Sequence, residues 1–285
     1  TDGIPDILYE AKHGADFVLQ SYDKAGGEVG SMITSMGTFG EKGYGNDHIW
    51  WGRPEYQDKM PADRGGPPRY ARSEPTTDYL GKYCANLAFV SRLMRPYDEN
   101  YSDRCLEAAK DIYEFTKPRM DITSEGSAYH GESNVSDDAA FGCLALLWAT
   151  GNRKYLEELC YDTTIYDKIK GKLAKSESEY PKLFNGGWFT YNDPVFYHAS
   201  ANTDWASDQA HVLWGFFKLV LSDDTLCEDL NISENERLKL IEKTVFNLTA
   251  NLGSVGLGDQ TIQLPNSGIW VPSVIKYELP WFLMH

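Results

Sequence analysis

The sequence predicts an all-α protein, and three observations support this prediction. Apolar residues recur at helical spacing over most of the chain, which indicates about eight helices. The alternation of apolar and polar residues that is typical of strands is almost absent. The 285 residues contain no linker rich in Pro or Ser, so we expect residues 1–285 to form a single domain around one large core.

The expected helices can be placed in order along the chain. The first follows Pro5, a residue favoured at helix starts, and ends near Gly26 and Gly27. A Thr cap at Thr76 opens the second, and the last begins around Ser233. After the first helix, the helical ranges are 76–94, 100–115, 136–149, two short stretches within 153–174, then 203–221 and 234–251.

Long loops rich in Gly, aromatic and polar residues separate these helices. They cover residues 26–75, 120–135, 180–203 and 252–273. When such loops alternate with short turns, they usually share one face of a helical bundle or barrel and carry the functional site. We therefore expect the site on that face.

Charge and composition exclude several classes of partner. The formal net charge of −15 argues against nucleic acid and anionic membranes, because both would repel such a surface. No apolar run is long enough to span a bilayer, and no export signal is recognisable, so we expect a soluble chain. The five cysteines are odd in number and lack CxxC spacing, which favours buried free thiols over disulfides or a zinc site.

The Gly-rich loop around residues 46–55 is the strongest candidate for ligand binding. It contains His48, Trp50 and Trp51 together with charged residues, a costly set to expose unless something binds there. Indole faces stack on the apolar C–H surface of a pyranose, while polar groups address its hydroxyls. This composition favours a sugar ligand. The alternative is that Trp50 or Trp51 fills the core beneath the loop.

Two consecutive carboxylates, Asp137 and Asp138, lie where a loop meets a helix. They are compatible with simple capping, because the helix dipole favours negative charge in the first turn. They are also compatible with calcium, which collects carboxylate, hydroxyl and carbonyl oxygens, although the spacing differs from an EF-hand. Asp204, in the aromatic-rich segment 188–205, is either a helix cap or a calcium ligand from a second segment.

These segments, in this order, resemble glycoside hydrolase family 9, the inverting endoglucanases and cellulases built as an (α/α)6 barrel, a six-hairpin toroid. Residues 3–19 are similar to the family's GIPDILDE helix, and residues 47–55 to its D-H-x-W-W-G-x-x-E loop. Residues 129–138 resemble its Y-N-S-x-S-G-x-x-D-E segment. Asp204 falls where the family's W-D-x-K turn precedes a helix.

The resemblance implies roles for particular residues. His48, Trp51 and Tyr129 are expected to line the sugar subsites. No zinc is expected, since some relatives bind it through cysteines near this loop and the chain has no Cys before residue 84. A structural calcium is expected, and its ligands would be Ser133, Asn134, Asp137, Asp138 and Asp204.

The sequence also departs from the family pattern. Glu132 stands where relatives can carry a stacking Trp, Asn134 replaces Gly, and Asp138 is one methylene shorter than the usual Glu. The family's catalytic base lies in a D-A-G-D motif before the first helix, and its acid Glu lies after the last helices. Neither motif occurs in residues 1–285, so we expect no catalytic residue here and an incomplete, central part of the barrel.

The expected function is that of a secreted endo-β-1,4-glucanase, or cellulase, with β-glucan as its substrate. Inversion needs two carboxyls about 6.5–9.5 Å apart, and both would lie outside these residues, so the segment alone is expected to be inactive. One alternative is a non-catalytic glucan-binding α/α-barrel protein. Another is a different α/α-barrel carbohydrate enzyme, such as an epimerase or lyase, which would have only His48, His130 and His198 available for its cleft.

Overall fold

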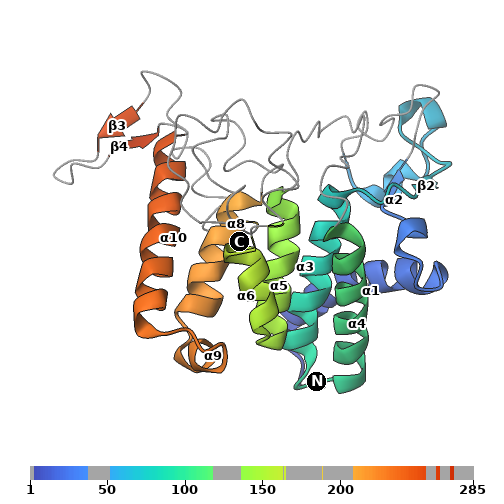
Figure 1. The fold of residues 1–285 in the computed structure, drawn as a ribbon. Helices are drawn as coiled ribbons and strands as arrows, with labels where there is room; N and C mark the ends of the chain where they lie inside the picture. The colour runs from blue at the N-terminus through green and yellow to red at the C-terminus, as the bar shows by residue number, and fades with distance from the viewer. Residues whose placement is uncertain are drawn as a thin grey trace.

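The computed structural model describes residues 3–37, 52–117, 136–162, 164, 188, 208–254, 261–263 and 270–272. Most of these residues are helical, which confirms the predicted all-α class (Figure 1). The main helices, in chain order, are α1 (Asp6–Lys24), α3 (Thr77–Met94), α4 (Glu99–Thr116), α5 (Ser136–Thr150), α6 (Arg153–Cys160), α8 (Gln209–Gly215) and α10 (Glu234–Ser254).

Shorter elements join these helices. Helix α8 continues directly as a π-helical segment, η7 (Phe216–Leu221). The remaining helical elements are α2 (Pro54–Gln57), α9 (Asp224–Asp229) and the 3-10 turns η1 (Val29–Ser31) and η3 (Ala62–Arg64). None of the described helices is both long enough and apolar enough to cross a bilayer.

Two short antiparallel strand pairs complete the described part. Strand β1 (Ser35–Gly37) pairs with β2 (Tyr70–Arg72), and β3 (Thr261–Gln263) pairs with β4 (Trp270–Pro272). The pair β1–β2 lies inside the segment 26–75 and the pair β3–β4 inside the segment 252–273, and the sequence predicted both segments as loops. Three residues are too few to establish an alternating pattern, so these strands could not be recognised from periodicity.

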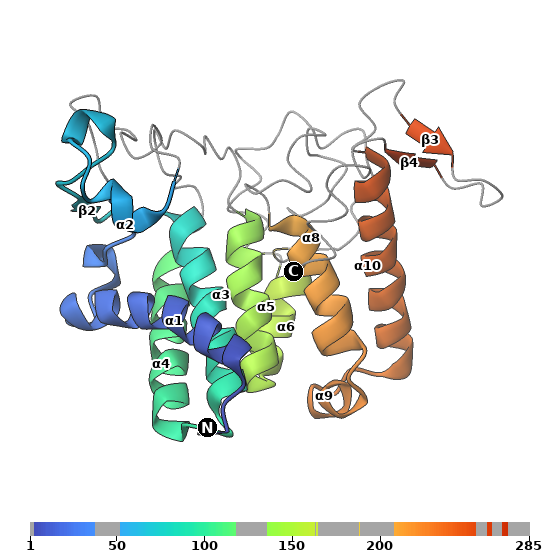
Figure 2. The same cartoon turned by 180° about the vertical axis from the view of Figure 1, so that it is seen from behind.

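From α3 to α10, successive main helices run antiparallel and pack side by side (Figures 1 and 2). Short connections close the pairs α3–α4 and α5–α6 at the lower end of Figure 1, and α9 lies between η7 and α10 at that same end. Helix α3 packs on both α4 and α5, and α5 packs on α6 and α8. Antiparallel helix pairs of this kind are the repeating unit of an (α/α)6 barrel.

The opposite ends of these helices meet at the upper end of Figure 1. The helices α3, α5 and α8 begin there, and α4, α6 and α10 end there. Three of the long loops predicted from the sequence, 120–135, 180–203 and 252–273, connect to these ends. We call this side the loop-bearing end.

Helices α3 and α5 approach each other closely because small residues line their contact. A Cβ atom built on Gly81 would lie 2.4 Å from the carbonyl oxygen of Asp138, which is too close for any side chain. One turn further, a Cβ on Gly142 would lie 3.0 Å from the Cys84 sulfur. The two glycines therefore fix the register of α3 against the first turns of α5.

Helix α1 crosses α3 and α4 rather than running along them (Figure 2). Ala15, Val18 and Leu19 are buried on its apolar side. On its polar side, the hydroxyl of Tyr101 in α4 donates to Asp16 at 2.8 Å, and Lys12 pairs with the same carboxylate at 2.8 Å. The expected first helix is thus confirmed over most of its predicted length.

The two predicted helix caps have different outcomes. Ser233 behaves as expected, since its hydroxyl accepts a hydrogen bond from the Glu236 backbone N–H at 3.2 Å. The prediction of a Thr76 cap is wrong as regards the side chain. Thr76 occupies the N-cap position of α3 but makes no capping hydrogen bond, because its hydroxyl is directed to the Glu74 carbonyl at 3.4 Å.

Candidate functional site

The structure describes two of the residues predicted for the site, Asp137 and Asp138. Both lie in the first turn of α5 at the loop-bearing end, as the sequence predicted, and both side chains are buried. The other predicted residues lie outside the described part of the chain, so their roles stay predictions. These are the sugar-binding candidates His48, Trp51 and Tyr129 and the calcium candidates Ser133, Asn134 and Asp204.

Asp137 links the start of α5 to the start of α8. Its Oδ2 accepts a hydrogen bond from the backbone N–H of Asp208, the residue before α8, at 3.0 Å. A carboxylate in the first turn of a helix is also favoured by the helix dipole. Capping electrostatics and this cross-helix bond are therefore sufficient to account for the place of Asp137.

Asp138 and Asp208 both lie close to one lysine of α3, Lys82. The Nζ of Lys82 in α3 lies 2.5 Å from Oδ1 of Asp138 and 3.6 Å from Oδ2 of Asp208. The Asp138 side chain is 1% exposed and that of Lys82 is 38% exposed. We call Lys82, Asp137, Asp138 and Asp208 the first lysine group. It joins the starts of α3, α5 and α8.

The carboxyl of Asp208 stays ionised in this setting. Burial raises its pKa, but the hydrogen bond with His211 and the charge of Lys82 outweigh burial, and the net result is a pKa below the ordinary value. The distance between His211 Nδ1 and Asp208 Oδ1 is 3.4 Å. The first lysine group thus contains more carboxylates than ammonium groups.

The first lysine group fits the predicted calcium only in part. Carboxylate oxygens are the ligands that calcium prefers, and Asp137 offers them at a helix start. At Asp138, however, an ammonium already lies against one oxygen, and a protonated lysine has no lone pair with which to bind a metal. Within the described ranges, no set of three or more His, Cys, Asp or Glu side chains is arranged to hold a metal ion.

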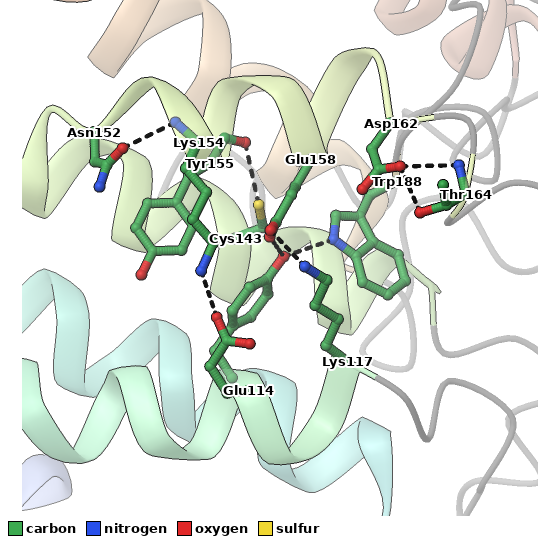
Figure 3. A network of polar contacts seen from close by, with 11 residues as sticks. Glu114, Lys117, Cys143, Asn152, Lys154, Tyr155, Glu158, Asp162, Thr164 and Trp188 are labelled. Carbon is green, nitrogen blue, oxygen red and sulfur yellow. Dashed lines mark hydrogen bonds and ion pairs between the residues drawn. The ribbon is translucent and has the colours of Figure 1, made fainter.

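A second lysine group lies at the same end, where α4 and α6 finish (Figure 3). The ammonium of Lys117 donates to Glu158 Oε1 at 2.5 Å, and the hydroxyl of Tyr113 donates to Glu158 Oε2 at 2.7 Å. The indole N–H of Trp188 donates to the Tyr113 oxygen at 2.9 Å. Both carboxylate oxygens of Glu158 are therefore satisfied within the protein.

Burial keeps the donors of the second lysine group protonated. Tyr113 and Trp188 are almost fully buried. Burial, followed by the neighbouring Cys143 and the charge of Glu158, raises the pKa of Tyr113 well above its ordinary value, so its hydroxyl remains a donor. A general acid or base needs an oxygen that reaches the substrate, and Glu158 has both oxygens occupied. This group anchors Trp188 rather than performing chemistry.

Sequence reasoning missed Lys82, Glu158 and Lys117. Each lies in a helix where a charged residue is ordinarily solvated. For Glu158 a signal did exist, because Tyr155 and Leu159 place it on the apolar side of α6. For Trp188 the sequence left core and ligand-facing roles open, and the structure places it in the core.

Two aromatic side chains are exposed near the predicted sugar-binding loop. Tyr56 in α2 is 49% exposed and Tyr70 in β2 is 51% exposed. Both elements lie at the loop-bearing end (Figure 1). The Lys59 ammonium lies 5.1 Å from the centre of the Tyr56 ring, whereas no cation is recorded over Tyr70 within the described residues.

Several known proteins are similar in sequence to this chain. The sequence model described as Glycosyl hydrolase family 9 matches residues 1–238. Endoglucanase D of Acetivibrio thermocellus is 27% identical over 201 residues, which cover 67% of this chain and 28% of that protein. Endoglucanase 25 of Arabidopsis thaliana is 28% identical over 163 residues, which cover 53% of this chain and 24% of that protein.

A solved structure is also similar to this chain. It is the cellulase Cel9M of C. cellulolyticum, with 17% identity and a TM-score of 0.35 over 85% of this chain and 62% of that one. The chain spans only 28% and 24% of the length of the two curated endoglucanases.

Proposed function

Because this chain belongs to glycosyl hydrolase family 9, we propose that it acts in an endo-β-1,4-glucanase that hydrolyses cellulose or another β-glucan. The observation that carries the proposal is the family match over residues 1–238. The names of the similar endoglucanases support the same substrate class. Cellulose is an insoluble polymer outside the cell, so we also propose that the protein is secreted.

We propose that glucan binds at the loop-bearing end through His48, Trp51 and Tyr129. Ring faces stack on sugar C–H surfaces, and polar side chains bind hydroxyls. The exposed rings of Tyr56 and Tyr70 at this end support the proposal, because a long polysaccharide needs several stacking positions. Hydrolysis would proceed with inversion, by an acid and a base carboxyl outside residues 1–285 that act on opposite faces of the bond.

We further propose a structural calcium held by Ser133, Asn134, Asp137, Asp138 and Asp204. When bound, this ion would supply a hard, divalent charge that cross-links the segment before α5 to the segment before α8. The buried carboxylate of Asp137 and its hydrogen bond to the Asp208 N–H support an attachment at this place. Chelation should lower the melting temperature, because a metal bound only by the folded state stabilises it.

The glucanase proposal is tested by hydrolysis of carboxymethyl-cellulose with the full-length protein. Endo cleavage lowers viscosity faster than it releases reducing ends, and inversion gives the α-anomer first, which NMR detects. His48→Ala and Trp51→Ala should reduce turnover by about tenfold or more, as expected when an interaction of about 1.4 kcal/mol or more with the transition state is lost. Tyr97→Ala, an exposed change in the turn between α3 and α4, is the matched control.

The same experiment separates the two classes of function. A protein that retains glucan on an affinity gel but hydrolyses none of it would be a non-catalytic glucan-binding protein. Unchanged turnover in both loop variants would contradict the proposed subsites.

A further inference from the structure

We propose that Lys82 takes the place of a divalent cation at the loop-bearing end, where its ammonium holds Asp138 and Asp208 together and joins α3, α5 and α8. The proposal concerns the calcium proposed above and is independent of the glucanase activity. It starts from one observation: a carboxylate expected to bind calcium is already in contact with a positive charge of the protein itself.

The distances support a bridging role for Lys82. Its Nζ lies 2.5 Å from Asp138 and 3.6 Å from Asp208, so one ammonium contacts carboxylates that precede or open two different helices. The Lys ammonium is a compact point charge with three donors, which suits contact with two carboxylates at once. The hydrogen bond from the Asp208 N–H to Asp137 adds a second link between the same two helices.

Burial makes this contact more important than a surface ion pair. Asp138 is 1% exposed and Asp208 is 14% exposed on the side chain. A buried carboxylate that loses its counter-charge is strongly destabilising, whereas an exposed pair contributes little. The Lys82 charge therefore stabilises these buried carboxylates, together with His211 at Asp208.

The helix packing fixes Lys82 in place. Gly81, its neighbour, lets the α3 backbone approach the Asp138 carbonyl so closely that a Cβ there would be 2.4 Å away. The base of the Lys82 side chain is thus held against the first turn of α5. Its contact with Asp138 follows from the helix register and does not depend on a long side chain reaching across solvent.

The ammonium and a calcium ion exclude each other at Asp138. Two cations at the same carboxylate repel at short range, and a calcium ligated by Asp138 must first displace Lys82. Lys82 therefore stabilises the calcium-free protein and weakens calcium binding. Without the charge of Lys82, the stability of this end should depend on bound calcium instead.

The test compares Lys82→Met with the unaltered full-length protein in EDTA and in millimolar CaCl2. Met keeps the length of the side chain and removes the charge. We expect the melting temperature of Lys82→Met to fall by about 5 °C in EDTA, the size expected for a broken buried pair in a chain of this length. Calcium should restore most of this loss and should bind the variant at least about tenfold more tightly, since the competing charge is gone.

Lys218→Met is the matched control, because Lys218 is an exposed lysine in η7 that does not belong to the first lysine group. It should behave like the unaltered protein in both buffers. If Lys82→Met does not fold, Lys82→Gln, which keeps a donor without the charge, is measured in its place.

Two results would overturn the proposal. An unchanged melting temperature in EDTA would show that Lys82 holds nothing together, and the calcium proposal would survive if the unaltered protein still responds to calcium. A destabilised variant that gains no more from calcium than the unaltered protein would show an ordinary ion pair. Hydrolysis of carboxymethyl-cellulose, measured separately, decides the glucanase proposal in either case.

Discussion

The two lysine groups at the loop-bearing end use the same charges in different ways. In the first, Lys82 contacts Asp138 and Asp208, with Asp137 beside them. In the second, Lys117 contacts only Glu158, and the other carboxylate oxygen receives a hydrogen bond from neutral Tyr113. The second group is balanced in charge, whereas the first has an excess of carboxylates.

Helix direction explains this difference. The helices α3, α5 and α8 begin at this end, and the positive ends of their dipoles favour carboxylates there. Lys117 is the C-cap residue of α4, where the dipole favours a cation. At this end of the molecule, carboxylates therefore collect where α3, α5 and α8 begin, and charges are balanced where α4 ends. Of the two lysine groups, the first is the one in which an added cation would be favourable.

The largest effect is expected from breaking the second lysine group. Glu158→Ala leaves Lys117 without its carboxylate and removes the acceptor of Tyr113, so the free energy of unfolding should fall by about 3–5 kcal/mol. Its neighbour Glu157 is exposed and pairs with Arg153 within α6, so Glu157→Ala should cost less than about 1 kcal/mol. Urea denaturation measures both, and equal losses would show that the buried network adds nothing.

A smaller effect is expected from separating α3 from α5 beneath the first lysine group. Gly81→Ala places a methyl group against the Asp138 carbonyl, and the resulting shift should cost about 1–3 kcal/mol. Gly14 in α1 is the control, because its Cβ would lie 3.6 Å from Asn86, an ordinary contact. Gly14→Ala should be neutral or stabilising by up to about 1 kcal/mol through helix propensity. A neutral Gly81→Ala in thermal melts would contradict the close helix contact.

The anchoring of Trp188 is expected to be weaker than either of these interactions. Trp188→Phe keeps an aromatic ring in the core but removes the N–H that donates to Tyr113, which should cost about 1–2 kcal/mol. Trp214 is 48% exposed, so Trp214→Phe should change stability by less than about 0.5 kcal/mol. The difference between the two tryptophans in urea denaturation measures the combined cost of the lost hydrogen bond and the lost buried packing at Trp188.

The simplest measurement concerns the reactivity of the buried thiols. All five cysteines are free and buried, as the sequence predicted. Burial raises the pKa of Cys105 to about 11 and also raises the pKa of Cys84 and Cys143, so these thiols stay protonated near neutral pH and react poorly. A thiol reagent should label none of them in the native protein and all five in guanidinium. Rapid native labelling would indicate that the core opens at this end.

The sequence predicted the fold better than it predicted contacts within the site. Helical spacing located α3, α4 and α5 to within a few residues, because α3 and α4 each bury an apolar side and α5 is buried nearly all round. Asp137 and Asp138 were placed at a helix start because the dipole favours acids there. The contact of Lys82 with Asp138 was not predictable in this way. It joins residues far apart in sequence and depends on how closely Gly81 lets two helices approach.

Because the helix pairs close at one end, the packed helices and the long connections are separate parts of the fold. Short turns and α9 hold the lower end of the pairs, while the long connections attach at the other end (Figure 1). Insertions and exchanges in surface connections are tolerated far better than changes in packed helices. The same helical frame can therefore accept connections of different length and sequence, by evolution or by loop grafting, without redesigning its interior.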